Sequence, residues 1–155
     1  MRGEPTPRWA EGCPPVRATA DVVLTSGGVS VGEEDHVRNA VLQRGHIDMW
    51  KVNMKPGKPL AYGRLAGPGG GEVDFIGLPG NPVSAFVVFC LFARPFLLRR
   101  MGARTDGLPT AFPVPLAAGL PHPGKRREFL RARLVDGKAE LYPRQGSGVL
   151  TSLGW

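Results

Sequence analysis

The sequence predicts an α/β layer over residues 20–104 and a small β domain over residues 105–155. Three observations lead to this division. Short apolar runs alternate with segments of helical spacing, which is typical of a sheet covered by helices. Two of these runs end in small-residue turns that open directly into helices. After Gly102 the chain changes to short strand-like pieces separated by proline and glycine.

The predicted elements follow in order along the chain. Residues 1–19 have no apolar period and are expected to form an irregular leader. The α/β layer then contains the strand Asp21–Thr25, the helix Glu33–Arg44, the strands His46–Met54, Leu60–Leu65 and Val73–Leu78, and the helix Val83–Met101. The last two strands are expected to form a hairpin through a glycine turn, and Leu42 is expected on the apolar side of the first helix. The second helix is expected to be bent or broken near Pro95. The β domain is expected to hold strands at Pro109–Leu116, Glu128–Leu134 and Ala139–Tyr142.

The charge is distributed unevenly. Residues 1–93 carry nine basic and nine acidic residues, whereas residues 94–155 carry eleven basic and four acidic ones, which accounts for the net charge of +7. No aromatic-rich motif accompanies this excess, so binding of nucleic acid is not favoured. A small anionic ligand and a plain solvated surface both remain open.

The cysteines and the apolar runs indicate where the protein resides. Cys13 and Cys90 lack the spacing of a metal site, and Cys90 is predicted to be a core residue. The N-terminus lacks a secretory apolar stretch, and the longest apolar run, about nine residues, is too short to span a bilayer. We therefore expect a cytoplasmic protein without membrane contact.

The first candidate site is the turn over residues 25–35, with the sequence TSGGVSVGEED. A strand that runs into glycines and then a helix exposes backbone N–H groups, which hold a phosphate or another oxyanion. Asp35 adds a carboxylate for a metal ion or a ligand hydroxyl. The alternative is a tight turn that only needs glycine.

The second candidate is a lysine cluster. Lys51, Lys55 and Lys58 surround a Pro-Gly-Lys-Pro turn, and closely spaced ammonium groups on a rigid loop suit a dianion. Ordinary solvated lysines are the alternative.

The third candidate is a second strand-to-helix turn, LPGNP at residues 78–82. Asn81 is a good N-cap and Pro82 suits the first helical position, so the helix would aim backbone N–H groups at the same edge as the first turn. An ordinary capped helix start is the alternative.

The fourth candidate lies in the β domain. Lys125–Arg131 alternates roughly as a strand, so that some arginines share one face, and QGSG follows at residues 145–148. A wet basic strand edge is the alternative. The histidines show no ligand spacing, and the sequence offers no Ser/His/Asp set.

Three motifs resemble the MoeA family of molybdopterin molybdenumtransferases, whose eukaryotic relatives include the E domain of gephyrin. They are TSGGVSVGEED at 25–35, MKPGKP at 54–59 and GLPGNPVSA at 77–85, in the family's order and separation. The resemblance runs from about Ala20 to the C-terminus. It implies an incomplete three-layer αβα domain of the MogA-like type, followed by a partial β domain.

By this resemblance, the family inserts molybdate into adenylylated molybdopterin in a Mg²⁺-dependent reaction that releases AMP. Molybdopterin and molybdate would be substrates, and the family is typically homodimeric. Carried over by motif, the catalytic residues would be Asp35, Lys51 and Lys55, with Asp35 also a Mg²⁺ ligand. The residues implied to bind the pterin, nucleotide and molybdate are Ser26, Gly27, Gly28, Ser30, Lys58, Pro79, Gly80, Asn81, Pro82, Arg126 and Ser147.

The chain also departs from the family's pattern. The family's chains are longer, and the first half of their α/β domain, with its first strand and acidic residues, has no counterpart here. We therefore expect a fragment whose central strand keeps an open edge, and its independent activity is an open question. A non-catalytic module that binds molybdopterin or a partner chain is the alternative.

Overall fold

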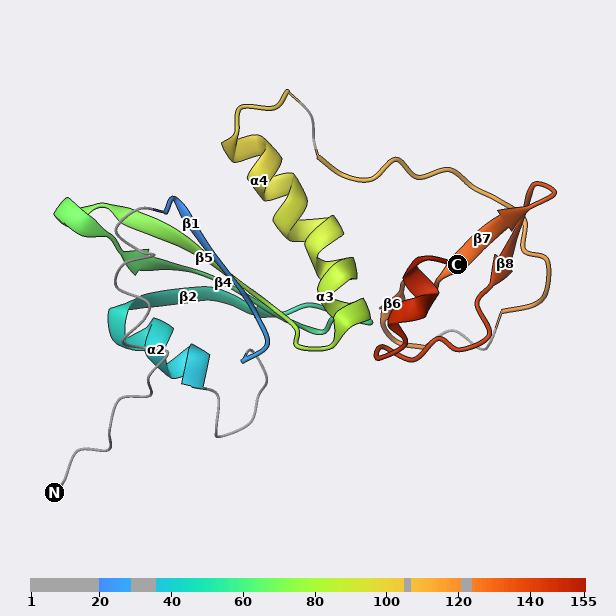
Figure 1. Cartoon of the computed structure of the whole chain (residues 1–155), viewed down its shortest axis with the longest axis horizontal. Helices are drawn as coiled ribbons and strands as arrows, with labels where there is room; N and C mark the ends of the chain where they lie inside the picture. Colours follow the sequence, from blue (N-terminus) through green and yellow to red (C-terminus); the bar gives the residue numbers. More distant parts are fainter. Residues whose placement is uncertain (1–19, 29–35, 105–106, 121–123) are drawn as a thin grey trace, which may run out of the picture.

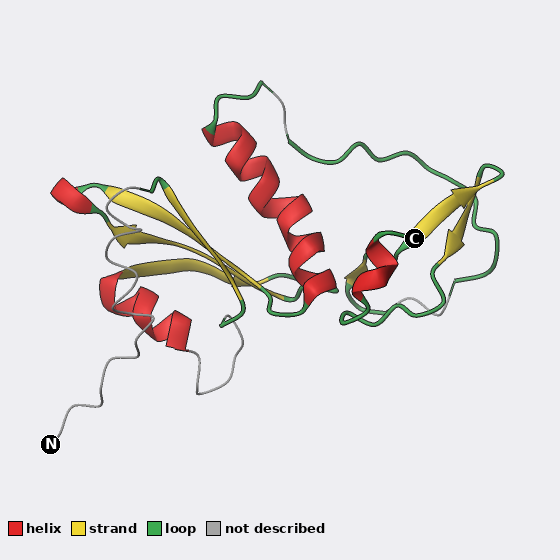
Figure 2. Cartoon of the chain, in the orientation of Figure 1, coloured by secondary structure: helices red, strands yellow, loops and turns green. Residues whose placement is uncertain are grey.

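The computed structural model describes residues 20–28, 36–104, 107–120 and 124–155. Its strands are β1 (Val22–Ser26), β2 (Gly45–Lys51), β3 (Met54–Lys55), β4 (Pro59–Ala66), β5 (Glu72–Leu78), β6 (Arg127–Glu128), β7 (Ala132–Val135) and β8 (Lys138–Leu141) (Figures 1 and 2). The helical segments are α2 (His36–Arg44), η1 (Pro68–Gly70), α3 (Pro82–Val88), η2 (Phe89–Ala93), α4 (Arg94–Arg100) and η3 (Leu150–Leu153). The strand predicted over His46–Met54 is two strands, because the chain turns at Val52, whose N–H donates to the Lys58 carbonyl at 2.9 Å.

The main sheet has the order β1-β5-β4-β2. β1 runs parallel to β5, with Ser26 opposite Leu78, and β4 runs antiparallel to both β5 and β2. The predicted hairpin of β4 and β5 is confirmed. β1 lies at one edge of the sheet that the described residues form. The parallel pairing brings the ends of β1 and β5 to one edge of the sheet.

Helices cover both faces of this sheet, so the predicted three-layer arrangement is confirmed (Figure 1). On one face, Val37 and Val41 of α2 pack with Val23 and Phe75 of the strands. On the other face, α3, η2 and α4 lie across β4 and β5. One detail of the prediction is wrong: Leu42, expected on the apolar side of α2, is 46% exposed.

The long helix over α3, η2 and α4 is widened rather than broken near Pro95. Proline lacks an N–H and its ring crowds the carbonyl four residues earlier, Leu91, which lies within the π-helical turn η2. The helix packs on the sheet through Val88 and Ala93. It is also long and apolar enough to cross a membrane, with mean hydropathy 1.6, although core helices of soluble proteins pass the same test.

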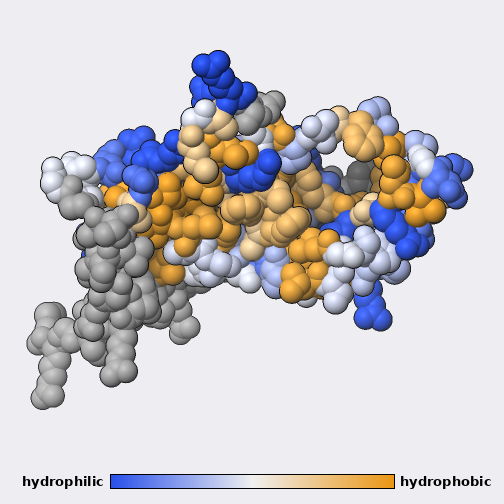
Figure 3. Space-filling view, turned by 45° about the horizontal axis from the view of Figure 1, so that its top comes forward, coloured by the Kyte–Doolittle hydropathy of each residue, from blue (hydrophilic) through white to orange (hydrophobic). Residues whose placement is uncertain are grey.

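The helix leaves apolar side chains open beside it. A hollow of about 240 Å³ is lined by Leu60, Tyr62, Ile76, Phe92 and Phe96, and apolar side chains gather over the middle of the molecule in Figure 3. Only 22% of the most apolar part of the helix is buried. Cys90, predicted as a core residue, is accordingly half-buried, because the helix face that carries it borders an open groove.

The C-terminal region builds its strands differently from the prediction. β7 and β8 form an antiparallel hairpin, whereas β6 pairs in parallel with β3 of the α/β layer. The strand predicted over Glu128–Leu134 is therefore split. The strand predicted at Pro109–Leu116 is wrong: in the described chain this segment forms only one bridge, from Leu116 to Ala139. Its three prolines lack the backbone donors that a ladder needs.

Candidate functional site

The two strand-to-helix turns touch each other at the edge where β1 and β5 end. The Gly27 N–H donates to the Leu78 carbonyl at 3.0 Å, and the Ser26 hydroxyl lies 3.4 Å from the Pro79 carbonyl. Gly27 has a φ of 87°, and a Cβ on Gly80 would lie 3.4 Å from its Cα. Glycine permits both this conformation and this approach. The structure therefore brings together Ser26, Gly27, Pro79 and Gly80, and Gly28 (φ 68°) follows directly.

The lysine loop lies at the same edge. Lys51 ends β2 opposite Pro59, the first residue of β4, and β4 runs antiparallel to β5, so that it begins beside the end of β5. Lys51, Lys55 and Lys58 are all exposed. The three lysines thus lie at the same end of the sheet as the two glycine turns, and their exposure leaves them accessible to an anion.

The loop packs closely against α3 at Gly57. Its φ is +101°, and a Cβ there would lie 2.5 Å from the Cγ2 atom of Val88, which is fully buried. A glycine is needed at this position for both reasons. Since the Pro56–Lys58 turn lies on the helix, the loop that carries the candidate lysines is anchored rather than free.

The start of α3 differs from the prediction. Asn81 stands at the N-cap, and Pro82 is the first helical residue, but the Asn81 side chain makes no capping hydrogen bond. The Val83 N–H donates instead to the Ser147 carbonyl at 3.2 Å. One of the backbone donors expected to face a ligand is therefore already used, and the bond places Ser147 of the C-terminal region against the turn.

A two-residue strand pair joins the lysine loop to the C-terminal region. β3 and β6 align Lys55 with Glu128, and the Phe129 N–H donates to the Lys55 carbonyl at 2.8 Å. The ammonium of Lys55 lies 3.2 Å from Glu128 Oε1. Arg126, which is exposed, immediately precedes β6. The sequence did not single out Glu128, because only the register of β6 on β3 shows which lysine it meets.

A buried arginine holds the loop before Ser147. Arg131 is 8% exposed, and its guanidinium donates to the Arg144 carbonyl at 3.1 Å, to the Gly146 carbonyl at 2.9 Å and to the Ser152 hydroxyl at 3.0 Å. Burial lowers the pKa of the Arg131 guanidinium, which nevertheless stays charged at neutral pH. Arg131 therefore does not belong to a solvated basic strand edge, which was the alternative interpretation of this segment, because these acceptors draw its side chain inward.

Gln145 adds to the same network. Its side-chain oxygen accepts from the Arg131 N–H at 2.9 Å, and its amide nitrogen donates to the carbonyls of Arg131 at 2.8 Å and Tyr142 at 2.7 Å. Nothing in the spacing of these residues indicates the network. It depends on how the loop over residues 144–146 folds beside Arg131.

Ser30 and Asp35 lie outside the described residues. The structure therefore does not place the carboxylate predicted to be catalytic and to hold Mg²⁺. Within the described ranges, histidine, cysteine, aspartate and glutamate form no group of three suited to a metal ion. Glu128, the acidic residue beside Lys55, is engaged in its ion pair, so the described residues do not fit a Mg²⁺ site by themselves.

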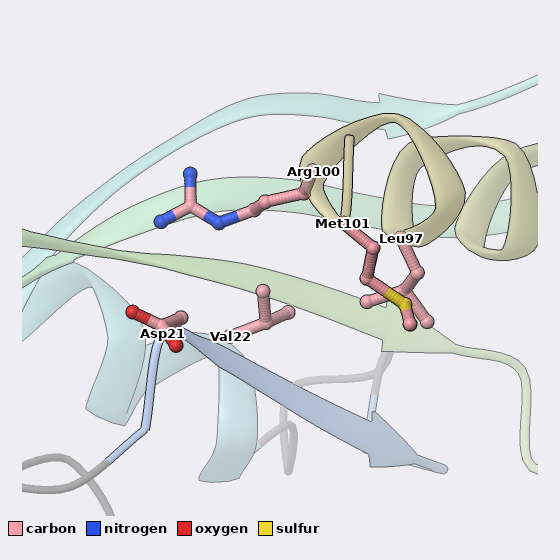
Figure 4. A pocket seen from close by; sticks show the side chains of 5 residues that line it. All are labelled: Asp21, Val22, Leu97, Arg100 and Met101. Carbon is pink, nitrogen blue, oxygen red and sulfur yellow. The ribbon is translucent and has the colours of Figure 1, made fainter. Parts of the chain in front are cut away.

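A separate hollow lies at the opposite end of β1. It has a volume of about 720 Å³ and is lined by Asp21, Val22, Leu97, Arg100 and Met101 (Figure 4). Arg100 on its rim pairs at 2.8 Å with Asp74, a buried carboxylate that also accepts from the Tyr62 hydroxyl at 3.0 Å. This hollow contains none of the predicted site residues, which stand where β1 ends.

Comparisons with known proteins agree with the resemblance read from the motifs. Residues 16–99 match a family described as a probable molybdopterin binding domain, and residues 113–155 match the MoeA C-terminal region, domain IV. A molybdopterin molybdenumtransferase of Haemophilus influenzae is 38% identical over 115 residues. A molybdopterin molybdenumtransferase 2 of Mycobacterium tuberculosis is 37% identical over 142 residues.

A solved structure shows a similar fold. The molybdopterin biosynthesis MoeA protein of Pyrococcus horikoshii superimposes with a TM-score of 0.60 at 27% identity, over 86% of this chain and 30% of that one. The two enzymes named above are matched over 74% and 88% of this chain, but over 27% and 33% of their own length. The chain thus spans about a third or less of the relatives it matches.

Proposed function

Because the chain belongs to the family of probable molybdopterin binding domains, with a MoeA C-terminal region behind it, we propose that it acts in molybdenum cofactor biosynthesis as part of a molybdopterin molybdenumtransferase. The proposed substrates are adenylylated molybdopterin and molybdate, and the proposed products are AMP and the molybdenum cofactor. The relatives' name supports molybdopterin and the transferase class. The assignment of the adenylyl group and of molybdate is based on the motif resemblance alone.

The proposal is based on one observation: the lysine loop and the two glycine turns lie at the same end of the main sheet. The three lysines of the loop lie at the end of the main sheet where β1 and β5 end, and the turns of Gly27 and Gly80 touch at this same end. Both proposed substrates are anions. At an effective dielectric of 20, two opposite unit charges 4 Å apart attract each other by about 4 kcal/mol. Because the lysines are exposed, water screens this attraction, so that binding of an anion requires several cations together.

The C-terminal region completes the proposed site. Arg126 reaches it through the β3–β6 pair, and Ser147 through its bond to Val83. We assign the lysines and Arg126 to the phosphate and molybdate oxygens, and the Ser26–Gly28 turn with Pro79–Pro82 to the pterin and nucleotide. A Mg²⁺ requirement belongs to the proposal only through Asp35, which the family resemblance implies as a ligand. Homodimer formation and a cytoplasmic location are further parts of it.

The test is a titration with adenylylated molybdopterin beside an assay of AMP release on adding molybdate. Lys55→Ala is expected to weaken binding about tenfold, the effect of losing about 1.4 kcal/mol. Lys138→Ala, which removes an exposed lysine from β8, is the control and should leave binding unchanged. Normal AMP release by either Lys55→Ala or Asp35→Ala would show that the site assignment is wrong.

The same two measurements separate the proposal from its alternative. Binding without AMP release supports a non-catalytic molybdopterin-binding module. If the chain neither binds adenylylated molybdopterin nor releases AMP, the proposed function does not hold for it.

A further inference from the structure

The ion pair between Lys55 and Glu128 joins residues 73 positions apart in the sequence. It follows from the backbone rather than from chance contact of two long side chains. β3 and β6 place Lys55 directly beside Glu128, and backbone bonds hold the strands on either side of the pair. These run from the Arg127 N–H to the Asn53 carbonyl at 3.3 Å and from the Phe129 N–H to the Lys55 carbonyl at 2.8 Å.

The pair contributes little to the stability of the fold. The side chains of Lys55 and Glu128 are 55% and 28% exposed, and ion pairs at such positions have small effects on folding because water screens them. Glu128 is thus a poor candidate for a structural residue. Its contact instead restricts the motion of the Lys55 ammonium, which is carried by a flexible side chain of four carbons.

The charges around Lys55 explain why such a restraint is useful. Arg127 precedes Glu128 on β6, Arg126 comes just before that strand, and Lys51 and Lys58 flank Lys55 along the chain. Among these like charges, an unpaired ammonium would move outward into solvent. Glu128 takes one of the three N–H donors of Lys55 and leaves two for an anion.

We propose that Glu128 is a positioning residue, which holds the Lys55 ammonium at the sheet edge so that its two remaining donors face the anionic substrate. The identity of the ligand in this proposal rests on the proposed function, whereas the contact between Glu128 and Lys55 does not depend on it. It assigns Glu128 no contact with substrate and no part in proton transfer. Its action on the substrate passes through Lys55.

The geometric test is NMR of the ¹⁵N-labelled lysine ammonium groups in the whole chain. Glu128→Gln should make the Lys55 ammonium more mobile, and Glu128→Asp should restore part of the restraint. Glu140→Gln is the matched control, because Glu140 also forms an exposed cross-strand ion pair, with Arg133 at 2.8 Å. An unchanged mobility of Lys55 in Glu128→Gln overturns the proposal.

The functional test is a double-mutant cycle on the binding of adenylylated molybdopterin. Glu128→Gln should weaken binding about fivefold, the order of an exposed ion pair of about 1 kcal/mol. It should have no further effect in a Lys55→Ala background. Tighter binding in Glu128→Gln would mean that Glu128 competes with the anion, and an equal effect in both backgrounds would mean that it acts without Lys55; either result overturns the proposal.

The two tests distinguish their causes of failure. If the unaltered chain does not bind adenylylated molybdopterin, the proposed function fails, and the mobility of the Lys55 ammonium still decides whether Glu128 positions it. If the chain binds and Glu128→Gln has no effect on affinity, positioning fails while the proposed function stands.

Discussion

Gly57→Ala is a sharp perturbation of the candidate site, because it acts on the loop that carries the lysines without changing their charge. The new Cβ would lie 2.5 Å from the Cγ2 atom of Val88 and 3.5 Å from the Ser84 carbonyl oxygen. Both neighbours belong to α3 and are buried. The loop must then move away from the helix, or the helix must shift.

Two costs combine at this position. Alanine at a φ of +101° is strained by about 1–2 kcal/mol, and the clash with Val88 adds about 1–3 kcal/mol, as overpacking of a filled core does. Gly70→Ala separates the two terms. Gly70 has a φ of +81°, and nothing lies within 4 Å of the position of its Cβ, so only the strain applies there.

Urea denaturation of both variants measures these terms. Gly57→Ala should lower the free energy of unfolding by about 1–3 kcal/mol more than Gly70→Ala. Removing the Val88 methyl groups should relieve the clash, so Gly57→Ala combined with Val88→Ala should cost less than the sum of the two, with a coupling of about 0.5–3 kcal/mol. Equal losses for Gly57→Ala and Gly70→Ala, or strict additivity with Val88→Ala, would refute this account of the loop.

The C-terminal loop and the start of α3 give two further tests by urea denaturation. Arg131→Met should lower the free energy of unfolding by about 1–3 kcal/mol, because the carbonyls of Arg144 and Gly146 lose a buried donor. The control Arg144→Met removes an exposed side chain and should change this free energy by no more than about 0.5 kcal/mol. Similar losses in the two variants would contradict the role of the network. Asn81→Ala should cost less than about 0.5 kcal/mol, since its side chain does not cap α3, whereas a capping residue costs about 1 kcal/mol. A loss of that larger size would show that Asn81 caps the helix in solution.

The α/β layer was predictable because its signals are local. The run at Asp21–Thr25, the glycine turn of the hairpin and the Asn81–Pro82 helix start each lie within a few residues, and each indicates its element through backbone chemistry. The prediction failed where the outcome depends on a distant partner. The apolar side chains of Pro109–Leu116 suggest a strand, but its prolines and the lack of a neighbouring strand in the described chain leave it with a single bridge.

In the candidate site too, the sequence indicates local features but not contacts between distant residues. The sequence could indicate Lys55 and Ser147 as candidate binding residues, because motif resemblance applies residue by residue. It could not indicate what holds them, since Glu128 and Arg131 lie in a run of basic residues where every side chain looks solvated. The fold turns one of these inward, and it pairs the other with a lysine from a different layer.

Two short backbone connections join the α/β layer to the C-terminal region at the candidate site, where Phe129 also packs against the core of the layer. One is the two-residue pairing of β3 with β6, and the other is the bond from Val83 to Ser147. The first sets where Lys55 stands relative to Arg126, and the second sets where Ser147 stands relative to the Pro79–Pro82 turn. An anion that contacts both regions, as the proposed function requires, would depend on how these contacts position the two regions. Under the proposed function, changes to side chains that restrain these elements, such as Glu128 and Arg131, should alter binding even though these side chains need not touch the anion.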